Sequence, residues 1–174
     1  MSDAPSSQLP HENVDTFLAY ALKVEQEAAL RFGQLADAMG AAGNRGAEKI
    51  FRKMSLFSQM HYAEARARAR YHEVPEMTPG DFQWPDIEAP ETAAIWAADP
   101  LIAKDQALEI ALDAEQAAHD FYAAVLAETS DPEVKALASE FVIEEGEHVQ
   151  WMKRWIAEDK VNAPHDWVDA LEHH

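Results

Sequence analysis

The sequence predicts an all-α protein, an antiparallel four-helix bundle with a long crossover between its second and third helices. Three observations carry this prediction. Apolar residues recur at alternating steps of three and four in four separate stretches, which is the spacing of a helix face that packs into a bundle. Cap residues, glycines and prolines separate the stretches. The connection between the second and third stretches is long and rich in proline, whereas up-and-down helices need only short loops.

The first two helices follow a polar N-terminal segment. Residues 1–11 carry two prolines, and we expect them to form a disordered arm. The first helix is expected over residues 13–39, with Gly40 as its stop. Asn44 can cap the second helix, which is expected to run to about Tyr71.

The long connection covers residues 74–99, with a short helix expected around residues 91–97. Asp99 is followed by proline, which predicts an N-cap and first position for the third helix, ending near Thr129. Asp131, also followed by proline, repeats this signature and opens the fourth helix.

The expected domain organisation is a single bundle over residues 12–160, with the fourth helix reaching about residue 159. Residues 161–174 are expected to form a C-terminal extension, in which residues 164–170 could add one further turn. The last four residues, 171–174, resemble a purification tag, so no site residue is expected among them.

Composition limits the classes of function. The 174 residues are 48% hydrophobic, enough for one domain with a core, and carry a formal net charge of −18. This charge disfavours binding to nucleic acid and to anionic membranes, and it attracts cations. No apolar run approaches the roughly 20 residues of a membrane span. The sequence has no cysteine, which excludes disulfides, thiol nucleophiles, iron–sulfur clusters and thiolate zinc sites. With no basic, apolar signal region at the N-terminus, we expect a cytoplasmic protein.

Ionisable residues interrupt the apolar face of every predicted helix. On the fourth helix a glutamate stands three residues before a histidine, so both lie on one face, one turn apart. Each half of the chain offers a glutamate on one helix and a histidine on the next. A buried carboxylate is costly unless it is paired or binds metal, and this ligand set suits iron, manganese or zinc. The candidate metal ligands are Glu25, His61, Glu115, Glu145 and His148.

This pattern resembles the di-iron carboxylate site of ferritin-like bundles, in which two helices give a glutamate each and two give Glu-x-x-His. The chain resembles the rubrerythrin branch of that superfamily over about residues 13–159. The most similar stretches are residues 115–122 and 145–149. The resemblance implies a ferritin-like four-helix bundle with a non-haem di-iron centre.

The resemblance also implies a role for each candidate residue. Glu25 and Glu115 would be terminal carboxylate ligands, and Glu145 would bridge the two metal ions. Each ion would bind one histidine, His61 or His148. No catalytic residue other than these ligands is assigned.

The sequence departs from the family pattern in three ways. Ser58 stands where the second helix should carry a bridging glutamate, three residues before His61. Ala118 stands where another metal-binding glutamate usually follows Glu115. The cysteine-ligated rubredoxin module of full rubrerythrins is missing, so an external electron donor is expected.

Ser58 leaves the expected centre one carboxylate short. Two ferrous ions carry four positive charges, against three carboxylates in the candidate set, and a buried excess charge costs on the order of several kcal/mol. Glu64, Glu144, His119 or a bound hydroxide could compensate. Alternatively, the site holds one metal ion or none.

Three functions stay open from the sequence. The first is a di-iron oxidoreductase, a peroxidase-type enzyme acting on peroxide or dioxygen. The second is ferroxidase-type oxidation or storage of ferrous iron, as in ferritins. The third is a degenerate bundle with a partial or absent metal site that serves as an interaction module. Iron is the expected cofactor, with manganese, zinc or a single metal ion as alternatives. A homodimer is expected because rubrerythrin-like bundles commonly dimerise.

Overall fold

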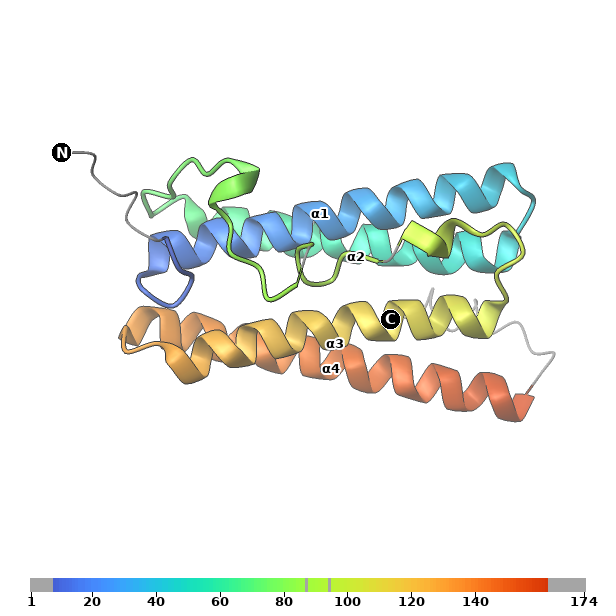
Figure 1. The fold of residues 1–174 in the computed structure, drawn as a ribbon. Coiled ribbons are helices and arrows are strands. Elements are labelled where there is room, and N and C mark those ends of the chain that lie inside the picture. Colours follow the sequence, from blue (N-terminus) through green and yellow to red (C-terminus); the bar gives the residue numbers. More distant parts are fainter. Residues whose placement is uncertain (1–7, 87, 94, 163–174) are drawn as a thin grey trace.

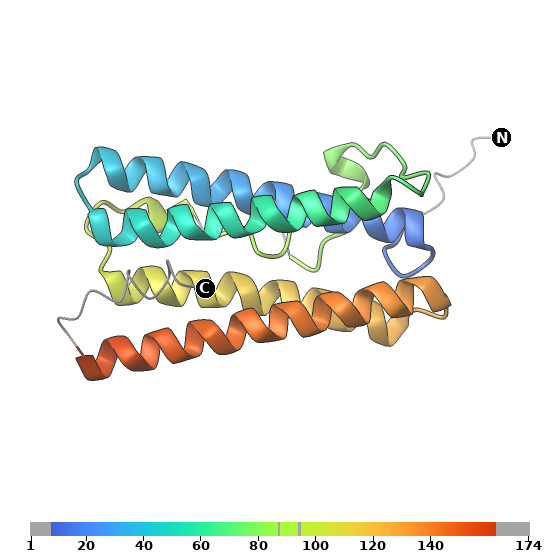
Figure 2. The same cartoon turned by 180° about the vertical axis from the view of Figure 1, so that it is seen from behind.

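Four long helices lie side by side in the structure, a computed structural model that describes residues 8–86, 88–93 and 95–162 (Figure 1). The described residues contain no strand. One antiparallel pair, α1 with α2, packs on a second pair, α3 with α4 (Figure 2). The predicted all-α, ferritin-like four-helix bundle is therefore confirmed. The helices are α1 (Val14–Ala41), α2 (Arg45–Ala69), α3 (Lys104–Glu128) and α4 (Pro132–Asn162).

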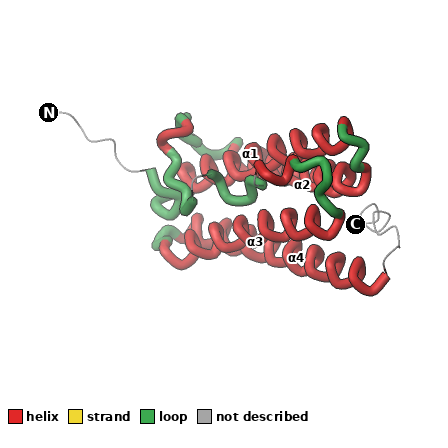
Figure 3. Tube along the Cα trace, turned by 45° about the vertical axis from the view of Figure 1, so that its right-hand side comes forward, coloured by secondary structure: helices red, strands yellow, loops and turns green. Residues whose placement is uncertain are grey.

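The crossover after α2 runs along the bundle from one end to the other (Figure 3). It contains two short 3-10 helices, η1 (Pro79–Asp81) and η2 (Ile95–Ala98), so the short helix expected over residues 91–97 is replaced by the later and tighter η2. Because of the crossover, α3 starts at the end of the bundle where α2 starts, and these two helices run parallel (Figure 1).

Two helix starts have the cap residue that the sequence indicates, Asn44 and Asp131, and Asn13 caps α1 in the same way. Asn13 Oδ1 accepts a hydrogen bond from Thr16 N at 2.9 Å at the start of α1. Asn44 Oδ1 accepts from Ala47 N at 3.3 Å at the start of α2. Asp131 Oδ1 accepts from two backbone N–H groups at the start of α4, at 2.8 and 3.2 Å. Each cap satisfies a backbone donor that the helix leaves unpaired.

The predicted start of α3 was wrong. Asp99 caps only a turn, in which its Oδ1 accepts a hydrogen bond from Leu101 N at 2.9 Å. The helix begins at Lys104, where Gln106 Oε1 accepts from Ala103 N at 2.9 Å. The Asp-Pro signature therefore marks a turn here and not a helix start.

The predicted stop of α1 at Gly40 was also wrong, because the helix continues to Ala41. A Cβ at position 40 would lie 2.7 Å from a carboxylate oxygen of Glu48, so a larger residue there would require the end of this side chain to move. Gly43, with a φ of 76°, takes the left-handed conformation between the two helices.

Two apolar clusters fill the bundle, one toward each end. One includes Phe32, Phe51 and Leu108, and the other includes Phe17 and Tyr20. The residues between the clusters, at the middle of the bundle, include most of its buried charged groups.

The ends of the chain lie partly outside the described residues. Within the expected arm, Gln8 and His11 accept hydrogen bonds through their carbonyls from Tyr20 Oη and Thr129 Oγ1, each at 2.9 Å, which attaches this part to the bundle. Residues 1–7 and the C-terminal extension from residue 163, including the turn expected at 164–170, lie outside. Among the described helices, none is long and apolar enough to cross a membrane.

Candidate metal centre

The structure brings all five predicted ligands together at the middle of the bundle. Glu25 comes from α1, His61 from α2, Glu115 from α3, and Glu145 and His148 from α4. The three glutamates are only 3%, 2% and 1% exposed, in chain order. The alternating three and four spacing explains this convergence, because it places each residue on the packed face of its helix.

Both histidines turn the Nδ1 atom toward the carboxylates. His148 Nδ1 lies 3.2 Å from Glu115 Oε2 and 3.3 Å from Glu145 Oε2. His61 Nδ1 lies 3.7 Å from Glu25 Oε2. The two imidazole rings stack, with centroids 4.7 Å apart and planes within 1° of parallel. Two nitrogen donors therefore face one group of oxygen donors.

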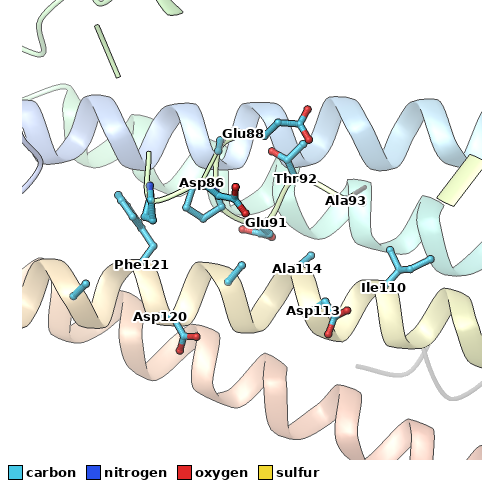
Figure 4. Close-up of a pocket in the computed structure, with 15 residues that line it drawn as sticks. Asp86, Glu88, Glu91, Thr92, Ala93, Ile110, Asp113, Ala114, Asp120 and Phe121 are labelled. Atoms are coloured by element: carbon cyan, nitrogen blue, oxygen red, sulfur yellow. The ribbon is translucent and has the colours of Figure 1, made fainter. Parts of the chain in front are cut away.

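A fourth buried carboxylate enters the centre from the crossover, and the sequence reasoning missed it. Glu91 is 2% exposed, and Figure 4 shows its side chain below the crossover, on the side of α3. Ser58 Oγ donates a hydrogen bond to Glu91 Oε1 at 3.3 Å. The carboxylate therefore reaches the position next to Ser58, where the family pattern has a glutamate on the second helix.

Two groups of donor atoms could each hold a metal ion. In one group, atoms of His61, Glu145 and His148 lie within 4.8 Å of one another. In the other, oxygen atoms of Glu25, Glu91 and Glu145 lie within the same distance. Glu145 belongs to both groups, which is the arrangement that a bridging carboxylate requires.

The residues that the sequence offered as compensators lie elsewhere. Glu64 is exposed, and Glu144 is half-buried and outside both donor groups. His119 is partly exposed, with its Nδ1 3.2 Å from Asp120 Oδ1. None of the three belongs to either donor group, although Glu64 acts electrostatically on His61 and Glu144 on Glu25.

Burial controls the charge of the carboxylates. It raises the pKa of Glu25 and of Glu91 well above the usual range, and it raises the pKa of Glu145 to about 7. Glu25 Oε2 and Glu91 Oε2 are buried and accept no hydrogen bond. No lysine or arginine in the described part of the chain is buried beside them. The carboxylates therefore lack a protein cation of fixed charge.

The pKa values of the two histidines shift in opposite directions. Burial lowers the pKa of His61. Burial also acts to lower the pKa of His148, but its contacts with Glu115 and Glu145 outweigh this effect and raise the pKa to about 10. In the metal-free protein His148 is thus the cation of the cluster. Unpaired buried oxygens beside imidazole nitrogens fit a divalent transition metal such as iron, manganese or zinc.

Comparison with known proteins agrees with this fold and donor set. The Rubrerythrin family model matches residues 16–156. The chain is also similar to the crystal structure of an uncharacterised conserved protein from Magnetospirillum magnetotacticum MS-1. The two share 34% sequence identity with a TM-score of 0.65, over 84% of this chain and 95% of that one. No curated protein matches the sequence.

Proposed function

The chain belongs to the rubrerythrin family, and on that premise we propose that it is a non-haem di-iron oxidoreductase that acts on peroxide or dioxygen. The observation that carries this proposal is the buried cluster of carboxylates and histidines at the middle of the bundle. Two donor groups that share Glu145 support a centre of two metal ions.

Each of the five predicted ligands has a role in the proposed centre. Glu145 is the shared ligand, and Glu25 and Glu115 are carboxylate ligands on either side of it. His61 and His148 give one Nδ1 atom each. The imidazolium of His148 must lose its proton before this nitrogen can bind a metal ion.

When bound, a pair of ferrous ions supplies two electrons by becoming ferric, which together with two protons reduces hydrogen peroxide to two water molecules. An external electron donor must then return two electrons, because the chain has no cysteine for an iron–sulfur centre of its own.

The surrounding side chains control water and protons at the centre. The two apolar clusters lie on either side of it along the bundle and limit the access of bulk water. Tyr122 is fully buried and its Oη has no hydrogen-bond partner. Burial, followed by the charges of Glu25 and Glu145, raises the pKa of Tyr122 well above 10. Its hydroxyl therefore keeps its proton at neutral pH and remains a hydrogen-bond donor in the core.

The buried carboxylates favour this function over that of a degenerate interaction module. Burying four carboxylates with His148 as the one cation of the cluster costs on the order of several kcal/mol. An interaction module has no use for buried carboxylates, whereas a metal centre needs them as ligands.

Oxidation of ferrous iron is a second candidate, favoured by an acidic groove between the crossover and α3. The groove has a volume of about 740 Å³, and Figure 4 shows the residues that line it. Its negative charge would attract ferrous ions toward the centre. The acidic residues in its lining are Asp86, Glu88, Glu91, Asp113 and Asp120.

Metal content and peroxide turnover test the proposed function. Protein purified without a tag and without added metal should contain about two iron ions per chain, and it should consume peroxide when a reduced electron donor is supplied. The variant Glu145→Ala should lose both ions. The matched variant Glu147→Ala, on the exposed face of the same helix, should keep them. Wild-type protein with no more metal than Glu145→Ala would overturn the proposal. Formation of an iron mineral without peroxide turnover would favour the second candidate.

A further inference from the structure

The segment of the crossover that carries Glu91 is fixed to the bundle by one arginine on α1. Arg31 Nη2 pairs with Glu88 Oε1 at 2.6 Å. Arg31 Nη1 donates a hydrogen bond to the carbonyl oxygen of Ala93. The arginine therefore holds the chain on both sides of Glu91, which would orient a side chain that no helix supports.

The backbone at Glu91 has a conformation that favours glycine. Thr92 N donates a hydrogen bond to Ala89 O at 3.2 Å, which closes a four-residue turn. Pro90 takes the second position of the turn and Glu91 the third, with a φ of 68°. This is the arrangement of a type II turn, in which the third residue is usually glycine. A residue with a side chain costs free energy there, and such strain is found at functional sites.

Burial of the Glu91 side chain costs free energy, as its backbone conformation does. It is buried, its Oε1 accepts a hydrogen bond from Ser58 Oγ, and its Oε2 has no hydrogen-bond partner. A glycine at this position would remove both the strain and the buried carboxylate. The presence of glutamate therefore needs an interaction that the protein atoms alone do not provide.

We propose that Glu91 is a metal ligand, and that it supplies from the crossover the carboxylate that α2 lacks at Ser58. This inference rests on the proposed function and adds a residue to it. Its side chain lies with Glu25 and Glu145 in one donor group, while Ser58 occupies little space and orients Oε1 by its hydrogen bond. With Glu91, four carboxylates balance the four positive charges of two ferrous ions. The crossover becomes part of the metal centre.

The first test compares two charge-neutralising variants in the crossover. Fe²⁺ is added without oxygen to metal-free protein, and bound iron is measured after gel filtration. Wild type and the control Glu76→Gln, whose side chain is exposed on the crossover and outside the contacts of Arg31, should bind two ions per chain. Glu91→Gln should bind one ion, or bind the second at least tenfold more weakly. Equal binding by Glu91→Gln and wild type would overturn the inference.

The second test separates a ligand from a structural residue. Glu91→Gly removes the strain and the buried carboxylate, so the metal-free variant should melt at a higher temperature than metal-free wild type while binding less iron. Adding Ser58→Glu to Glu91→Gly should restore the second ion, because it puts a carboxylate back on α2 at the same place. A lower melting temperature of Glu91→Gly without loss of iron would show that Glu91 only stabilises the crossover, and it would overturn the inference.

These measurements distinguish failure of the proposed function from failure of the inference about Glu91. If wild type binds two ions and both Glu91 variants also bind two, the inference fails and the proposed function stands. If wild type binds no iron under these conditions, the proposed function fails and the inference fails with it. Binding of two ions by wild type, with loss of one in both Glu91 variants and recovery in the double variant, supports both.

Discussion

The substitution Glu145→Gln should flatten the dependence of stability on pH in the metal-free protein. Glu145 is 1% exposed, and burial raises its pKa from 4.5 to about 7. The folded protein therefore holds this proton more tightly than the unfolded chain does. Stability is present at low pH and is lost as the pH rises through the window from 4.5 to about 7.

The size of the effect follows from the two pKa values. The difference between 4.5 and about 7 corresponds to about 3 kcal/mol at high pH, of which about 2.5 kcal/mol falls between pH 5 and pH 8. Glu145 also helps to raise the pKa of His148, which acts in the same direction. A glutamine amide does not titrate in this range, so any cost of burying it is the same at both pH values and cancels in the comparison.

Urea unfolding of chelator-treated protein at pH 5 and pH 8 gives the measurement. Wild type should lose at least about 2 kcal/mol more stability than Glu145→Gln between these two values. The control Glu147→Gln makes the same charge change on the exposed face of α4 and should follow wild type. An unchanged difference between pH 5 and pH 8 in Glu145→Gln would refute the reasoning that Glu145 is ionised at a cost in the folded protein.

Four further predictions concern metal binding and the fold. Free Fe²⁺ at 100 times its dissociation constant should stabilise the protein by about 2.7 kcal/mol, a rise in melting temperature of roughly 5–10 °C that a chelator reverses in calorimetry. Metal affinity should fall as the pH drops below about 10, where His148 gains its proton, and more steeply below about 7, where Glu145 does, and titration calorimetry in buffers of different ionisation enthalpy should detect the released protons. Arg31→Gln should destabilise the fold by about 1–2 kcal/mol and speed proteolytic cleavage within residues 82–93, as seen by mass spectrometry. Gly43→Ala should cost about 1 kcal/mol in urea unfolding, because position 43 has a φ of 76° in open space.

The helices and the inward-facing charged residues could be predicted because both depend on local periodicity. A spacing of three and four residues specifies which side chains share a helix face, whatever the partner helix is. Glu25, Glu115 and Glu145 are therefore buried where the pattern puts them. That these residues bind metal stays a prediction, since the pattern specifies position and not occupancy.

Glu91 could not be found in this way because the crossover has no periodic pattern. Its position depends on contacts distant in sequence, namely Arg31 and Ser58. The sequence carries one signal, the missing carboxylate at Ser58, but helical periodicity indicates only neighbouring helical positions as substitutes. The boundary error at Asp99 has a related cause, because an Asp-Pro pair suits a turn as well as a helix start.

Placing a carboxylate on the crossover and not on α2 changes what controls the metal centre. A ligand on α2 would be positioned by a helix that is packed along its length. Glu91 is positioned by a strained turn and by the contacts of Arg31 on either side of it. Metal binding would then favour the closed crossover, and by linkage any change that opens the crossover would weaken metal binding. The acidic groove lies between this same segment and α3. If Glu91 binds metal, the carboxylate that α2 lacks at Ser58 is supplied by a residue whose position depends on the contacts of Arg31.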